Sequence, residues 1–80
     1  MQLHWEDNFQ IQVEIEGDTA VISANRAGLL SLAGHLTVLA GEVPGSHLHL
    51  DEYNGLEDHS AELILVKTAD DPAPETAERT

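Results

Sequence analysis

The chain has 80 residues and a mass of 8.7 kDa, which is the size of one small domain. Its 15 acidic and 3 basic residues give a formal net charge of -12, and this charge excludes binding to nucleic acids or to anionic membrane surfaces. The lack of cysteine excludes disulfides, thiolate metal sites and thiol nucleophiles.

The first predicted elements are two strands joined by a tight turn. Apolar and polar residues alternate over 9–16, which is the two-residue period of a half-buried strand. Gly17 and Asp18 tolerate the positive φ of a hairpin turn, and a second strand is predicted over 19–24.

A helix is predicted over 26–40. Asn25 before it is a favourable N-cap, and Gly41 follows its last periodic residue. Apolar residues at helical spacing form one stripe, which we expect to lie buried against a sheet. The stripe consists of Leu29, Leu32, Ala33, Leu36, Leu39 and Ala40. The same spacing places His35 on the polar side.

Two further strands complete the order ββαββ. Residues 46–50 alternate again, and 61–67 form a continuous apolar run, which is typical of a strand covered on both faces and placed inside a sheet. The pattern predicts one α+β domain over 1–68, a small antiparallel sheet with one helix packed on one face. Residues 69–80 contain no large apolar side chain, and we expect a disordered acidic tail there.

One helix covers only one face of a sheet, so the other face needs a second cover. The N-terminal segment around Trp5 is one candidate. A second chain is the other, which would make the protein a homodimer, or a self-associating structural domain, through the uncovered sheet face.

His47, His49 and Asp51 alternate along one strand face and have the character of metal ligands. Further ligands would be needed, for which Glu57 and His59 are available. The simpler interpretation is that the histidines face solvent, the intervening leucines face the core, and no metal or other cofactor is bound. A small metal- or ligand-binding module is kept as an alternative function.

The sequence does not favour enzymatic activity. Its serines occupy no Gly-x-Ser-x-Gly turn, and its glycines form no phosphate-binding loop. The N-terminus has neither the basic region nor the apolar stretch of a signal peptide, so we expect a cytoplasmic protein.

Several stretches together resemble the immunity protein 32 family of bacterial polymorphic toxin systems, over about residues 9–68. They are an Asn-Arg-x-Gly-Leu helix start at 25–29, a Gly-Ser-His-x-His-Leu-Asp strand at 45–51 and Glu-Leu-Ile at 62–64. The resemblance implies a non-enzymatic α+β protein that binds and neutralises a cognate toxin domain. It carries over no catalytic residues.

The acidic loop over 51–60 is the predicted contact with such a partner. Acidic surfaces serve solubility in many proteins, but they also attract basic partners. We expect the contact to be made by Asp51, Glu52, Tyr53, Glu57 and Asp58. Tyr53 is the candidate anchor, with a ring folded back on the sheet as the alternative.

Overall fold

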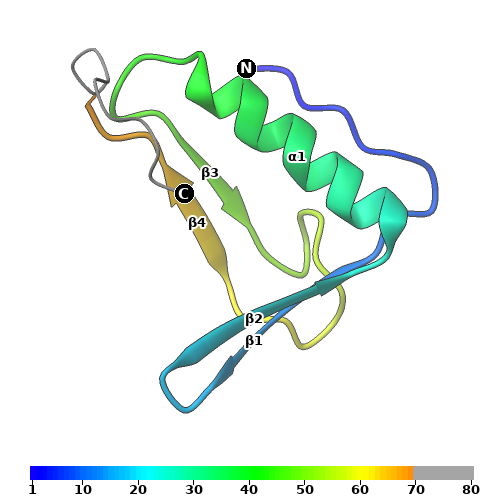
Figure 1. Ribbon diagram of the computed structural model, residues 1–80. Helices are drawn as coiled ribbons and strands as arrows, with labels where there is room; N and C mark the ends of the chain where they lie inside the picture. The colour runs from blue at the N-terminus through cyan, green and yellow to red at the C-terminus, as the bar shows by residue number, and fades with distance from the viewer. Residues whose placement is uncertain (70–80) are drawn as a thin grey trace, which may run out of the picture.

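The structure is a computed structural model that describes residues 1–69 (Figure 1). Its elements are the strands β1 (Ile11–Glu16) and β2 (Thr19–Ala24), the helix α1 (Arg26–Ala40), and the strands β3 (His47–Leu50) and β4 (Leu63–Val66). The predicted α+β class and the order ββαββ are confirmed. Except for Ala69, the expected tail lies outside the described residues. Over the described residues, no helix has the length and apolarity needed to cross a membrane.

The four strands form two sheets and not the single sheet that we expected. β1 pairs with β2 and β3 pairs with β4, both in antiparallel fashion. The connection between β3 and β4 lies along the other edge of β1, where the N–H of Glu57 donates to the carbonyl of Ile11 at 2.8 Å. The N–H of Ala61 donates to the carbonyl of Val13 at 2.7 Å. A loop therefore links the two sheets.

The hydrophobic core lies between α1, the inner face of β3 and β4, and the first half of β1. Its buried cluster consists of Ile11, Val13, Leu32, Leu50 and Leu56. The N-terminal segment runs alongside α1 (Figure 1) and packs Trp5 and Phe9 against this cluster, with their rings stacked at 4.6 Å. Trp5 thus covers the core on the same side as the helix. The expectation that this segment covers the far face of the sheet is wrong, since Ile64 and Val66 are exposed there.

The sequence predicted a buried stripe of six residues on α1, and this prediction is wrong for four of them. Leu32 and Leu39 are buried, whereas Leu29, Ala33, Leu36 and Ala40 are exposed. The buried face instead includes Ser31 and His35, because these side chains bind the main chain of the N-terminal segment. The Ser31 hydroxyl accepts the N–H of Glu6 at 2.8 Å, and His35 Nε2 lies 3.2 Å from the carbonyl of His4.

The expectation that the last strand lies inside a sheet, covered on both faces, is also wrong. β4 is half of a two-stranded sheet, so one of its edges is free. Leu63 and Leu65 are partly buried on the inner face, whereas Ile64 and Val66 are 53% and 56% exposed on the outer face. The register places His49 opposite Ile64, so the outer face mixes apolar and imidazole side chains.

Candidate functional site

The loop between β3 and β4, residues 51–62, begins with a tight turn that is fixed by its own hydrogen bonds. The carbonyl of Asp51 accepts the N–H groups of Asn54 at 2.9 Å and Leu56 at 3.0 Å. The Asp51 carboxylate accepts the N–H of Tyr53 at 2.9 Å, and the Asn54 side chain donates to the carbonyl of His49 at 2.7 Å. The turn is therefore held in one conformation without any partner.

Tyr53 lies in this turn, and it is 93% exposed. The sequence allowed the ring either to be exposed or to fold back on the sheet, and in the structure it is exposed. An exposed aromatic side chain on a fixed turn presents a large contact area and loses little main-chain freedom when it is buried by another protein. Tyr53 is therefore placed as an anchor residue would be.

The second half of the loop is attached to the core by Leu56, which is buried, and to β1 by the hydrogen bonds described above. Glu57 and Asp58 are exposed in this half. The carboxylate of Glu52 accepts the N–H of His59 at 3.3 Å, which brings the turn close to the residue that follows Asp58. The acidic pair Asp51 and Glu52 is thus held near the acidic pair Glu57 and Asp58.

The five residues predicted to contact a partner therefore differ in their surroundings. Tyr53, Glu57 and Asp58 are exposed, whereas Asp51 and Glu52 are partly buried and accept main-chain N–H groups within the loop. The side chains of Asp51 and Glu52 thus shape the loop as well as adding to its negative charge.

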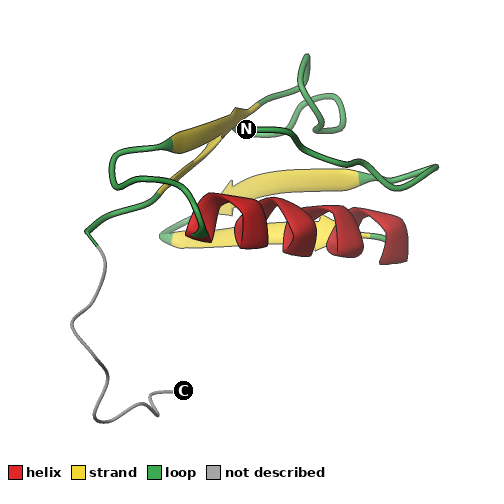
Figure 2. Cartoon of the chain, turned by 90° about the horizontal axis from the view of Figure 1, so that it is seen from above, coloured by secondary structure: helices red, strands yellow, loops and turns green. Residues whose placement is uncertain are grey.

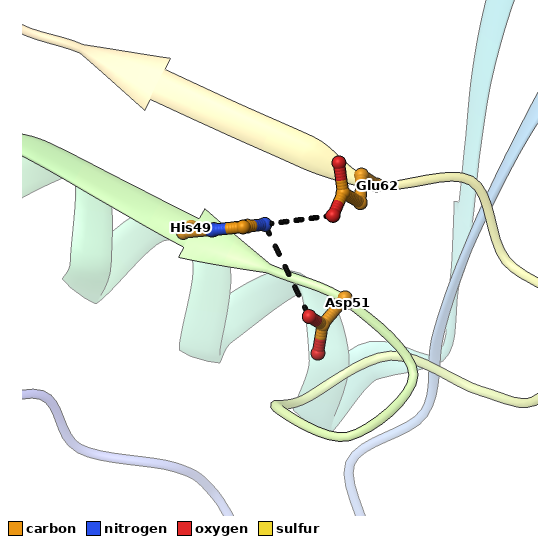
Figure 3. Close-up of side chains that lie close together, drawn as sticks. All are labelled: His49, Asp51 and Glu62. Carbon is orange, nitrogen blue, oxygen red and sulfur yellow. Dashed lines mark hydrogen bonds and ion pairs between the residues drawn. The ribbon is translucent and has the colours of Figure 1, made fainter.

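One cluster of metal-ligand type lies beside the turn (Figure 3). It consists of His49, Asp51 and Glu62, whose potential ligand atoms all lie within 4.8 Å of one another. His49 Nε2 is 3.1 Å from a Glu62 oxygen and 4.0 Å from an Asp51 oxygen. The sequence predicted His49 and Asp51 in such a group. His47, which was predicted with them, is not a member.

Glu62 was missed because a long loop leaves the pairing of its flanking strands open. The observed register ends with Leu50 paired with Leu63, and Asp51 follows Leu50 while Glu62 precedes Leu63, at the same end of the sheet. Glu57 and His59, which the sequence offered as additional ligands, are not in the cluster.

The cluster can hold a positive charge. The carboxylates of Asp51 and Glu62 lie close together and repel, and a cation between them removes that repulsion. A protonated His49 is one such cation. A divalent ion such as Zn²⁺ is another, because it accepts imidazole nitrogen together with carboxylate oxygen. The side chains of His49 and Glu62 are about half exposed, so their ion pair adds at most about 1 kcal/mol to stability.

The remaining residues with catalytic potential have structural contacts. The Ser31 hydroxyl accepts the N–H of Glu6, and the Ser60 hydroxyl accepts the N–H of Val13 at 3.1 Å. His35 is fully buried, its Nδ1 lacks a hydrogen-bond partner, and burial lowers its pKa below the ordinary value of 6.5. Its placement on the polar side of the helix was therefore wrong.

Comparison with known proteins gives one match. Residues 19–68 match the model of the family described as Immunity protein 32. The matched segment contains β2, α1, β3, β4 and the whole loop at 51–62, and it begins after β1. Neither a curated protein nor a solved structure matches the chain.

Proposed function

Since the chain belongs to the immunity protein 32 family, we propose that it binds a cognate bacterial toxin domain and neutralises it without catalysis. The family match over 19–68 is the observation that carries this proposal. The protein would act in the cytoplasm, where a toxin must be blocked before it reaches its target. No cofactor is needed for this role.

The loop at 51–62 is the proposed contact with the toxin. Asp51, Glu52, Glu57 and Asp58 are four of its five acidic residues, and Tyr53 provides an exposed ring among them. An acidic surface attracts a basic one and speeds the encounter, whereas a buried aromatic ring slows dissociation. This combination fits a toxin with a basic surface, such as a nuclease.

Neutralisation would follow from covering the active site of the toxin. An enzyme–inhibitor contact buries roughly 800 Å² on each partner, which is within reach of one face of a small domain. Because the hydrogen bonds of the turn are formed within the chain, the loop would bind without ordering itself first.

Binding of a divalent cation is a second candidate function, supported by the geometry of His49, Asp51 and Glu62. These residues come from β3, the turn and the residue before β4, so an ion there would join the two strands. Such a metal site would be compatible with binding of a toxin by the loop.

The experiment that tests the proposed function is co-expression with the product of the neighbouring gene. The test variant combines Asp51→Asn, Glu52→Gln, Glu57→Gln and Asp58→Asn, which removes four charges and keeps the acceptor oxygens for Tyr53 and His59. A matched control removes four exposed acids elsewhere, through Asp7→Asn, Glu14→Gln, Glu16→Gln and Asp18→Asn.

We expect the unmodified protein and the control to protect the cell. The loop variant should protect less, associate more slowly with the toxin and show a flatter salt dependence, because charges at the edge of an interface act mainly on the association rate. Equal protection by all three proteins would remove the loop from the proposal. A neighbouring product that is not toxic would remove the proposal itself.

A further inference from the structure

The outer face of α1 carries an uncovered apolar stripe. Leu29 and Leu36 are 55% and 49% exposed, and the small residues Ala33 and Ala40 lie exposed beside them. In the view of Figure 2, the described strands and loops lie behind α1 or above it in the picture, and none lies below it. The spacing of four, three and four residues is that of the contact positions of a two-helix coiled coil.

This helix face is also free of acidic residues, in a chain that has 15 of them. The acidic residues nearest to α1 in sequence are Asp18 and Glu42, and the helix itself carries a single charge, on Arg26. An exposed helix face in a globular protein is normally charged or polar. No acidic residue belongs to α1 itself, and in space Glu6 and Asp7 of the N-terminal segment lie near its first turn, beside Arg26 and Leu30.

We propose that two copies of this chain associate through their α1 helices, packed antiparallel about a two-fold axis between Ala33 and Leu36. This arrangement places Leu29 of each copy opposite Ala40 of the other, and Leu36 opposite Ala33. Each large side chain then meets a small one, so the helices approach closely without overlap. A two-fold axis is the commonest symmetry of protein dimers.

The charges at the two ends of the helix fit the same arrangement. The axis brings Arg26, at the start of one helix, to within one residue of Glu42, just past the end of the other. Arg26 forms no ion pair within the described residues of its own chain. The dimer would therefore contain two equivalent ion pairs, one at each end of the contact.

A hollow at the end of α1 gives Leu29 of the second copy a place to insert. It is lined by Leu36, Leu39, Ala40, Val66 and Lys67, together with the two residues that follow. Lys67 fixes one wall, because its Nζ donates to the carbonyls of Ala40 at 2.6 Å and Glu42 at 2.9 Å. Ala40, the residue that the axis places opposite Leu29, lies in this lining.

The outer face of β3 and β4, on which the sequence led us to expect a dimer, is less suited to a second copy. Ile64 and Val66 are exposed there, but Asp51 and Glu62 lie at the same end of the sheet. A dimer that packs the two faces with their strands parallel would bring these acids of both copies together, and desolvated like charges oppose association. A substitution on this face is included in the experiment, because it would disrupt a dimer formed through the sheet.

The experiment is sedimentation velocity of the full chain at micromolar concentration, comparing a substitution on α1 with one on β4. We expect the unmodified protein to be a dimer and Leu36→Lys to be a monomer. The matched control is Ile64→Lys, which introduces the same side chain at a similarly exposed position of β4, outside the hollow that receives Leu29, and should leave the dimer intact. Thermal unfolding of each variant checks that it is folded.

A charge exchange tests the antiparallel arrangement. Arg26→Glu should weaken the dimer by about tenfold at low salt, because it places two acids side by side at each end. Adding Glu42→Arg to that variant should restore the affinity. Recovery of this kind would not follow from a general effect on folding.

A monomeric unmodified protein would overturn the proposal. So would a dimer that Ile64→Lys disrupts and Leu36→Lys does not, which would place the contact on the sheet. The proposal is independent of toxin binding, since these measurements need no toxin and none of the altered residues lies in the loop at 51–62.

Discussion

The indole ring of Trp5 occupies the space that a side chain at Gly55 would need. Gly55 has φ +97°, a conformation that other residues rarely adopt, and it belongs to the turn that presents Tyr53. Trp5 also contacts His35 of α1 edge-on, at a centroid distance of 4.2 Å. The N-terminal segment thus connects the helix to the candidate binding loop and helps to set the position of the loop.

Gly55→Ala should destabilise the domain by about 2–4 kcal/mol, since the new methyl group overlaps the indole and the residue is strained at positive φ. The matched control is Gly45→Ala. Gly45 has nearly the same φ, +96°, but has open space around it, so only the strain of about 1 kcal/mol applies. Urea unfolding measures both. Equal losses for the two variants would mean that the contact with Trp5 contributes nothing.

His35 should make the stability depend on pH in the weakly acidic range. Burial lowers its pKa in the folded protein below 6.5, so the unfolded chain takes up a proton at a higher pH than the folded one does. Stability is therefore lost as the pH falls through 6.5 towards the pKa of the folded state. His35→Phe keeps a ring against Trp5 and cannot be protonated.

The measurement is the melting temperature of both proteins between about pH 7.5 and about pH 5. The other titratable groups are the same in the two proteins, so the difference between them reports on His35. We expect the unmodified protein to lose stability relative to His35→Phe as the pH is lowered. A constant difference would contradict the burial of a neutral imidazole.

Tyr53→Ala should separate binding from stability. Because the side chain is 93% exposed, its removal should change the free energy of unfolding by less than about 0.5 kcal/mol. If Tyr53 anchors the toxin, the same change should weaken toxin binding at least tenfold. Calorimetry of the isolated protein and a binding titration give the two values. Tyr53→Phe keeps the ring and serves as the control, and unchanged affinity in Tyr53→Ala would exclude the anchor role.

Zn²⁺ in modest excess should leave the melting temperature unchanged, because His49 already pairs with Glu62 and toxin binding needs no metal. A ligand that prefers the folded state would raise the melting temperature. A rise that is lost in His49→Ala and in Glu62→Gln, but kept in His47→Ala, would contradict this prediction and support the metal-binding candidate. The His47 variant is informative because that residue lies on the same strand face, outside the cluster.

The candidate site was only partly predictable. The acidic loop, its turn at Asn54 and Gly55, and the pairing of His49 with Asp51 follow from local sequence. Glu62 and the exposed position of Tyr53 do not, because they depend on how β4 pairs with β3 and on Trp5 under the turn. Such contacts join residues far apart in the chain, and local patterns carry no information about them.

The sequence by itself determined which local elements form and in what order. The strands predicted over 9–16, 46–50 and 61–67 are shorter in the structure, where they span Ile11–Glu16, His47–Leu50 and Leu63–Val66. The hairpin over β1 and β2 and the start of α1 were predicted correctly, because their hydrogen bonds join near neighbours. Asn25 is an example, since its side chain accepts the N–H of Gly28 at 2.8 Å. These bonds form in the same way whatever the rest of the chain does.

Only the tertiary structure decided which side of α1 is buried. α1 has apolar residues on both sides, so periodicity could not choose between them. The main chain of residues 4–6 packs against one side of α1, and its polar groups need Ser31 and His35 as hydrogen-bond partners there. Leu29 and Leu36 therefore face outward, because an unpaired buried polar group costs more free energy than an exposed leucine.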